Sequence, residues 1–180
     1  FAYLEAAGAT TVNGTTNFDR TNFFEVVPAP ELELALWLES DRMGWLMEGM
    51  TQEKLDEQRK VVKNERLQRT DNAAYGLASE KAWHALFPAG HPYRGMVIGS
   101  LVDLDKALLG DVKQFFDAYY APGNATLVVA GDFDPAAVQQ QIGRYFATLP
   151  TAGAPAPPRI EVPHVDSEVR IHHVEEIGKD

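Results

Sequence analysis

The order of strand-like and helix-like segments constrains the fold of this chain most. Two segments rich in Thr, Val and Phe come first, at residues 9–16 and 20–28, with the turn-forming letters TNFD between them. Helical spacing then recurs at 30–46, 51–70 and 71–88, and again at 100–120, where a short helix is followed by a longer one. An apolar strand pattern at 124–132 and a helix at 134–150 follow. Strands grouped before helices are typical of an α+β fold, so we expect a mostly antiparallel sheet covered by helices.

Several boundaries carry recognisable end signals. Gly8 is expected to end an opening helix, and Thr51 to begin the helix at 51–70. Asp71 or Asn72 is expected to cap the helix at 71–88. Asp134, followed by a proline, is expected to cap the last helix.

Composition excludes some classes of function. The chain has 180 residues, of which 45% are hydrophobic, enough for a packed core. A net charge of −10 argues against nucleic acid and anionic membranes as partners. The cationic run from Arg59 to Arg69 is interrupted by Glu65 and Gln68, so we interpret it as a solvated helix face. The chain has no cysteine, and no apolar run approaches the ~20 residues that span a bilayer.

The end of the sequence changes character after residue 150. Residues 151–163 are rich in Pro and Ala and are expected to form an extended linker. Residues 167–176 alternate like one strand of a separate unit. The chain opens inside a helical pattern and closes just after this alternation, so we expect it to be a piece of a longer protein.

Common catalytic motifs are absent from the sequence. No Gly-rich phosphate loop follows a strand, and no G-x-S-x-G, H-x-x-E-H or H-E-x-x-H occurs. His84 ends a helix, where an imidazole suits the dipole, and His91 is expected to be a hydrogen-bonded turn residue. His172 and His173 would point to opposite faces of a strand, which makes them a poor chelating pair.

Glu65 is the residue that the helical pattern leaves unexplained. It lies one turn after Val61 and Val62, so it leans toward their apolar stripe, where a carboxylate needs a partner. One interpretation is an ion pair with an arginine on another helix. The other is a metal ligand whose partners come from elsewhere, with Gln58 two turns earlier and near the site. Periodicity leaves both interpretations open.

Four stretches of the sequence say more about function than the helical periodicity does. They are GATTVNGTTNFDRTNFFEVVP, VVKNERLQR, HPYRGMVIGS and FFDAYYAPGNATLVVAGDFD. In order and spacing they resemble the pitrilysin/insulinase family of zinc peptidases, which includes mitochondrial processing peptidase, and above all its bacterial members. The resemblance covers residues 1–150, which would be a truncated N-terminal peptidase-like domain. Residues 164–180 would then be the start of a second homologous domain.

The resemblance assigns a role to Glu65. In the family an H-x-x-E-H helix supplies two histidine ligands for Zn²⁺ and the glutamate that activates water for peptide-bond hydrolysis. A glutamate on a later helix is the third ligand, and VVKNE places that role on Glu65. The H-x-x-E-H motif would lie upstream of Phe1, so we expect no catalytic residue in this fragment and no activity of the fragment alone. Many relatives carry a glutamate where this chain has Gln58, which puts a metal-tuning role for Gln58 in doubt.

The resemblance also implies partners. The family binds an extended peptide or unfolded polypeptide against an edge strand, and the match places Asn13, Gly14 and Thr15 there. The residues alone favour a strand-end turn at Asn13 and Gly14. A second homologous domain or partner subunit is a further expected partner. The rival reading is a non-catalytic homologue that acts as a binding or scaffolding subunit. The bacterial resemblance favours the periplasm or cell envelope.

Overall fold

The computed structural model describes residues 2–151 and 155–174. The chain divides into two compact units, each of which is described by itself: Phe1–Met50 with Leu108–Ala156, and Thr51–Ala107 with Pro157–Asp180. The first unit contains the strands, and the second consists of helices and an extended segment. Helices and an antiparallel strand pair confirm the expected α+β class.

The first unit is built around a β-hairpin. Strands β1 (Thr11–Thr16) and β2 (Thr21–Val26) are antiparallel, with Asn13 opposite Phe24 and Gly14 opposite Phe23. Their β-branched and aromatic residues favour extended backbone. A short helix, α1 (Ala2–Ala6), precedes them and ends at Gly8, whose φ of +86° fits the predicted stop.

Helices α2 (Leu32–Trp45) and α7 (Pro135–Phe146) form the core of the first unit. Leu36 and Val138 are buried there. Gly44 allows close packing, because a Cβ on it would lie 2.7 Å from Cδ2 of Leu149. Asp134 caps α7 as predicted, accepting hydrogen bonds from the next two free amides through Oδ1. Helix α6 (Leu109–Tyr119) completes the helices of this unit.

The predicted strand at 124–132 is wrong for this structure. Residues 125–130 have no strand partner within the described part of the chain, and Val128 is 79% exposed. A strand exists only where another strand completes its backbone hydrogen bonds, and the apolar pattern could not supply that partner. The described sheet therefore has two strands, β1 and β2.

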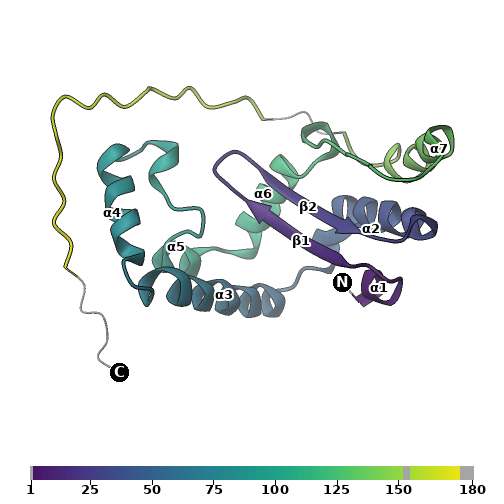
Figure 1. Cartoon of the computed structure of the whole chain (residues 1–180), viewed down its shortest axis with the longest axis horizontal. Coiled ribbons are helices and arrows are strands. Elements are labelled where there is room, and N and C mark those ends of the chain that lie inside the picture. Colours follow the sequence, from purple (N-terminus) through teal and green to yellow (C-terminus); the bar gives the residue numbers. More distant parts are fainter. Residues whose placement is uncertain (1, 152–154, 175–180) are drawn as a thin grey trace. The chain divides into compact units, whose positions relative to one another are not determined.

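The second unit contains α3 (Gln52–Arg66), α4 (Gly76–Leu86) and α5 (Leu101–Lys106). The hydroxyl of Thr51 accepts a hydrogen bond from the Lys54 amide at 3.3 Å, so the predicted start of α3 is confirmed. Its last turn continues as a π-helical turn, Leu67–Asp71, after which the chain bends sharply into α4 (Figure 1).

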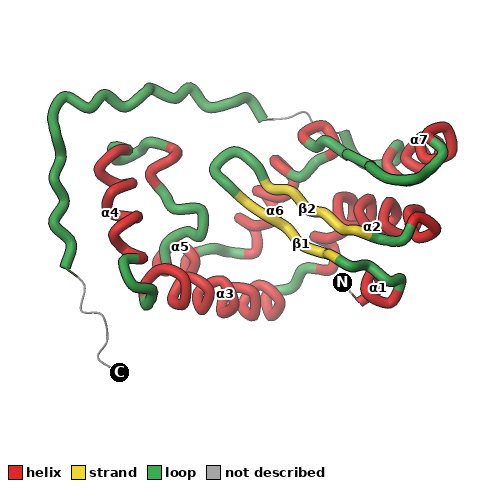
Figure 2. Tube along the Cα trace, in the orientation of Figure 1, coloured by secondary structure: helices red, strands yellow, loops and turns green. Residues whose placement is uncertain are grey.

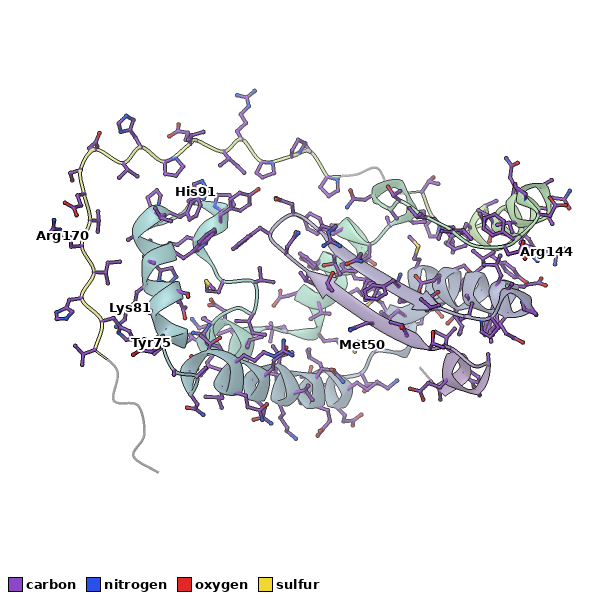
Figure 3. The ribbon with its side chains drawn as sticks, in the orientation of Figure 1. Met50, Tyr75, Lys81, His91, Arg144 and Arg170 are labelled. Atoms are coloured by element: carbon purple, nitrogen blue, oxygen red, sulfur yellow. The ribbon has the colours of Figure 1, made fainter. Side chains whose placement is uncertain are left out.

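The predicted cap of α4 at Asp71 or Asn72 is wrong. Asp71 belongs to the π-helical turn and pairs with Arg66, so its carboxylate is already committed. The helix begins after Tyr75, which has a φ of +59° and is labelled in Figure 3. Gly76 follows because a Cβ there would lie 2.0 Å from the carbonyl oxygen of Thr70.

The segment after residue 154 has no regular secondary structure where it is described. Residues 155–163 form an extended segment (Figure 2), and residues 152–154 of the expected linker lie outside the described part. The expected strand at 167–176 is wrong for residues 167–174, and residues 175 and 176 lie outside the described part. As at 125–130, an alternating pattern forms a strand only beside a partner. Among the described residues, no helix combines the length and the apolar character needed to cross a membrane.

Candidate functional site

Helix α3 presents two chemically different faces. Arg59, Lys63 and Arg66 fall within one narrow sector at 3.6 residues per turn, whereas Gln58 and Glu65 lie about a third of a turn away. The first sector packs against the rest of its unit. The second is the one that the sequence singles out for chemistry.

The cationic sector is a packing face. Arg59 donates to the carbonyl oxygens of Leu104 at 2.8 Å and Ala107 at 2.6 Å, which are terminal acceptors of α5. Lys63 pairs with Asp105 at 2.7 Å. The interpretation of this run as a solvated helix face is therefore wrong for these residues. Composition cannot distinguish them from solvated cations, because their partners lie 42 to 48 residues away in sequence.

Arg66 is the centre of this packing face. Its side chain is 9% exposed and lies 2.7 Å from the Glu80 carboxylate and 3.3 Å from that of Asp71. A third contact, at 2.6 Å, is its hydrogen bond to the carbonyl oxygen of Gly99. Arg66 therefore connects α3, the π-helical turn, α4 and the loop before α5. The sequence did not lead us to predict this network. The arginine directly after Glu65, the predicted metal ligand, is the one feature of the sequence that could have indicated it.

Glu65, the adjacent residue, has a very different environment. Its side chain is 37% exposed, and its carboxylate pairs at 2.8 Å with Arg69, whose side chain is 78% exposed. The expected pair with another helix is wrong, because Arg69 lies one turn further along the same helical run. Val61 is 56% exposed, so the stripe beside Glu65 is also open in the described structure. Exposed i,i+4 pairs are worth only about 0.3–0.5 kcal/mol, so this carboxylate is readily released.

Glu65 could supply one oxygen ligand to a metal, but the described residues near it do not complete a metal site. Gln58 is exposed and lies two turns earlier on the same face, as predicted. Within residues 2–151 and 155–174, no three His, Cys, Asp or Glu side chains come together to hold a metal ion. A zinc site that includes Glu65 therefore requires further ligands from outside these residues.

The histidines behave as structural residues where they are described. Nδ1 of His91 accepts a hydrogen bond from the Tyr93 amide at 3.0 Å, which confirms the predicted turn role. His91 also packs against Phe87, with ring centroids 4.7 Å apart. His84 lies in the last turn of α4, where Arg94 donates to its carbonyl oxygen at 2.8 Å. Nδ1 of His173 lies 2.8 Å from the Lys81 ammonium group.

The segment Asn13–Thr15 lies in β1, so the alternative reading of Asn13 and Gly14 as a strand-end turn is wrong. All three residues are exposed. Within the described residues β1 pairs with β2 alone, which leaves its other edge open. An open edge offers backbone donors and acceptors to an extended peptide.

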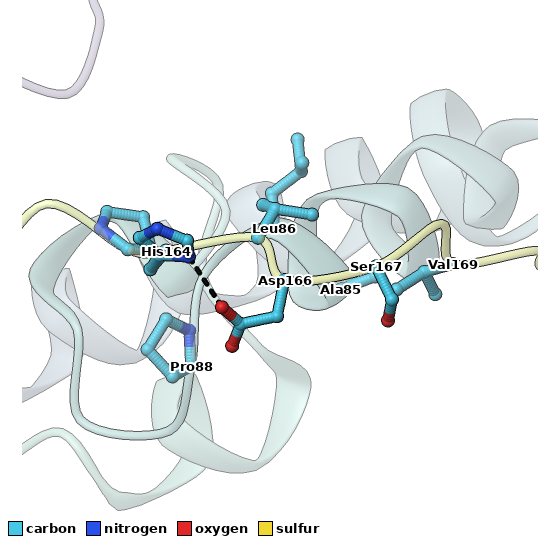
Figure 4. A pocket seen from close by; sticks show the side chains of 9 residues that line it. Ala85, Leu86, Pro88, His164, Asp166, Ser167 and Val169 are labelled. Atoms are coloured by element: carbon cyan, nitrogen blue, oxygen red, sulfur yellow. Dashed lines mark ion pairs between the residues drawn. The ribbon is translucent and has the colours of Figure 1, made fainter.

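A hollow of about 260 Å³ lies in the second unit, between the end of α4 and residues 163–169 (Figure 4). It contains an ion pair between His164 and Asp166 at 2.7 Å, whose side chains are 84% and 87% exposed. None of the predicted site residues lines it. Without burial, this pair has the character of a surface contact.

The described chain is thus an α+β fold with a partly exposed carboxylate on α3, at Glu65, and an open strand edge on β1. Residues 107–180 match the family described as Peptidase M16 inactive domain. The zinc protease PqqE of Helicobacter pylori is 31% identical over 137 residues, which cover 76% of this chain and 30% of that protein. A crystal structure of a protease from Helicobacter pylori matches with a TM-score of 0.74 and 28% identity, over 91% of this chain and 38% of that one.

These findings confirm the resemblance to the pitrilysin (M16) family, and this chain is a relative of its peptidases. The chain spans about a third of the length of the proteins it matches.

Proposed function

We propose that this chain is part of a zinc-dependent endopeptidase or oligopeptidase, in which Glu65 is one protein ligand of the metal. The contrast between neighbouring residues on α3 carries the proposal. Arg66 is buried, pairs with two carboxylates and donates to a backbone carbonyl oxygen, so it anchors the helix. Glu65 is half-exposed and engaged only in a weak surface pair, so its carboxylate is available to a cation. The relative named as a zinc protease supports the choice of metal.

In this proposal each residue of the chain has a limited task. Bound Zn²⁺ supplies Lewis-acid chemistry to peptide hydrolysis. Glu65 holds one position of the metal and contributes negative charge, and Gln58 lies near the site without charge. The two histidine ligands and the general base come from an H-x-x-E-H motif before Phe1. The domain division also stands as a proposal, with 1–150 a truncated peptidase-like domain, 151–163 a linker and 164–180 the start of a second domain.

Substrate binding is proposed for the open edge of β1. An extended peptide or unfolded polypeptide adds there as a further strand along Asn13, Gly14 and Thr15. A second homologous domain or partner subunit supplies further contacts. The location that goes with this proposal is the bacterial periplasm or cell envelope, which is only what the sequence resemblance implies.

The metal content of the full-length protein tests the proposal. Glu65→Gln keeps the shape of the side chain and removes its charge, so zinc per protein molecule and peptide hydrolysis should both fall at least tenfold, as expected for a lost charged ligand. Glu57→Gln is the matched control, because Glu57 lies on the same helix in an exposed pair with Lys60. Equal zinc content in the two variants would refute the role of Glu65.

A second candidate function is a non-catalytic subunit that binds peptides or scaffolds a partner. The description of the family matched by residues 107–180, an inactive domain, favours it. The coding sequence upstream of Phe1 discriminates between the two. An H-x-x-E-H motif on an amphipathic helix supports the peptidase. Replacement of both histidines supports the subunit, and Glu65 would then be only the partner of Arg69.

A further inference from the structure

The two edges of β1 can be distinguished by the register of the hairpin. The Asn17 amide donates to the carbonyl oxygen of Arg20 at 2.8 Å, and antiparallel ladder bonds recur at every second residue. Asn13 and Thr15 therefore direct their backbone N–H and C=O groups toward β2. Val12, Gly14 and Thr16 direct theirs toward the open edge. Of the three residues proposed above to bind peptide, Gly14 is the one whose backbone faces an incoming strand.

The outward amide of Gly14 is already occupied. Oδ1 of Asn13 accepts a hydrogen bond from it at 2.8 Å. Short amide side chains compete with ladder partners for nearby backbone groups in this way. Because this N–H group in the middle of the edge already has an acceptor, the open edge has one fewer free group with which another strand could pair.

The Asn13 side chain has room to leave this position. Asn13 is exposed and lies on the face of the hairpin opposite to Phe23. The Phe23 face packs against the rest of the unit, with the guanidinium of Arg42 3.9 Å from the ring centroid and Tyr120 nearby. Displacement of the carboxamide would therefore disturb none of these packing contacts.

We infer that Asn13 is an internal cap on the substrate-binding edge, which an extended peptide must displace before it can pair with Gly14. This inference rests on the proposed function, because it specifies how strand addition at β1 is regulated. The cap protects the edge when no peptide is present and lowers the affinity for peptides that are present. Asn13 is thus a residue that tunes substrate affinity, and Gly14 supplies the backbone contact.

Amide hydrogen exchange of the peptide-free protein tests the cap. In Asn13→Ala, exchange at Gly14 should be about fivefold faster, the factor that corresponds to one hydrogen bond of about 1 kcal/mol. Asn13→Asp keeps an oxygen acceptor and should retain the protection. Thr11→Ala is the matched control, because Thr11 is exposed on the same strand and lies on the same face, two residues before Asn13. Equal Gly14 exchange in wild type and Asn13→Ala overturns the cap.

Peptide binding tests the competition. The probe is a short Thr- and Val-rich peptide with a lysine at each end, which should protect the amides of Val12, Gly14 and Thr16. Asn13→Ala should bind it about fivefold more tightly than wild type or Thr11→Ala. Protection with unchanged affinity overturns the inference but leaves strand addition intact. Failure of the probe to protect the three amides in every variant overturns strand addition itself, whatever the Gly14 exchange rate of the free protein.

Discussion

A methyl group on Gly14 would lie 3.2 Å from ring carbon Cδ1 of Phe23 and 3.3 Å from the carbonyl oxygen of Asn22. The two residues are direct partners across the hairpin, so the ring covers the space that the missing side chain leaves. Arg42 stacks on the same ring and also pairs with Glu39. Because Gly14 has no side chain, the Phe23 ring of β2 can lie over β1 and still contact Arg42 of α2.

Gly14→Ala should destabilise the protein by about 1–3 kcal/mol, the usual cost of overpacking, because the ring cannot move without disturbing Arg42. Gly110→Ala is the control, since a Cβ there meets nothing within 4 Å and alanine favours a helix. That variant should be as stable as wild type or more stable. Urea unfolding of both variants measures the difference, and equal stability would show that the Phe23 contact does not constrain position 14.

Arg66→Met should lower the free energy of unfolding by as much as about 3–5 kcal/mol, because it leaves the partly buried carboxylates of Glu80 and Asp71 without their cation. Arg69→Met should change it by no more than about 0.5 kcal/mol, since its pair with Glu65 is exposed. The two arginines lie three residues apart, and denaturant titration of both variants compares them under identical conditions. Similar losses would contradict the assignment of Arg66 as the anchor of the second unit.

Glu25 should make stability depend on pH. Burial, reinforced by the nearby Glu39 carboxylate and opposed by Arg42, raises the pKa of Glu25 above its ordinary value of 4.5. The folded state then binds the proton more tightly than the unfolded state. The favourable contribution of Glu25 to folding stability is complete when the pH is below the ordinary pKa of 4.5. It is lost as the pH rises through the raised pKa of the folded state.

Glu25→Gln should therefore be more stable than wild type at neutral pH, and the difference should shrink as the pH falls toward 4. Thermal unfolding at several pH values checks this dependence. Glu48→Gln, at an exposed glutamate of the same unit, is the control and should follow wild type. A constant gap between Glu25→Gln and wild type at every pH would show that the substitution acts through packing instead.

Local signals in the sequence predicted most helices and the hairpin. Thr51 and Asp134 form the caps expected of them, because a cap depends on residues within one turn. The predicted strand at 124–132 and the predicted start of α4 were wrong because they depend on residues far from these segments in sequence or on side-chain contacts. The first depends on a partner strand, and the second on an ion pair between Arg66 and Asp71 that extends the preceding helix.

In the candidate site, too, the positions of residues along the chain could be predicted, whereas their side-chain partners could not. The helical position of Glu65 follows from spacing, and the strand position of Gly14 from the family resemblance. The partner of Glu65 and the capping of the Gly14 amide by Asn13 do not, because they depend on side-chain positions that many sequences could satisfy differently. The packing role of Arg59 and Lys63 could not be predicted either. A cationic side chain gives the same sequence pattern whether it faces solvent or contacts the end of a helix that is distant in sequence.

The most direct test of the zinc proposal is the position of the metal in the full-length protein. Diffraction data from zinc-loaded crystals, collected at the zinc absorption edge, should show an anomalous peak at coordination distance from the Glu65 carboxylate, about 2.0–2.2 Å from its oxygen. The Glu65–Arg69 pair should then be broken. A zinc-loaded structure in which Glu65 still pairs with Arg69 and the peak lies elsewhere would contradict the assignment of Glu65 as a ligand.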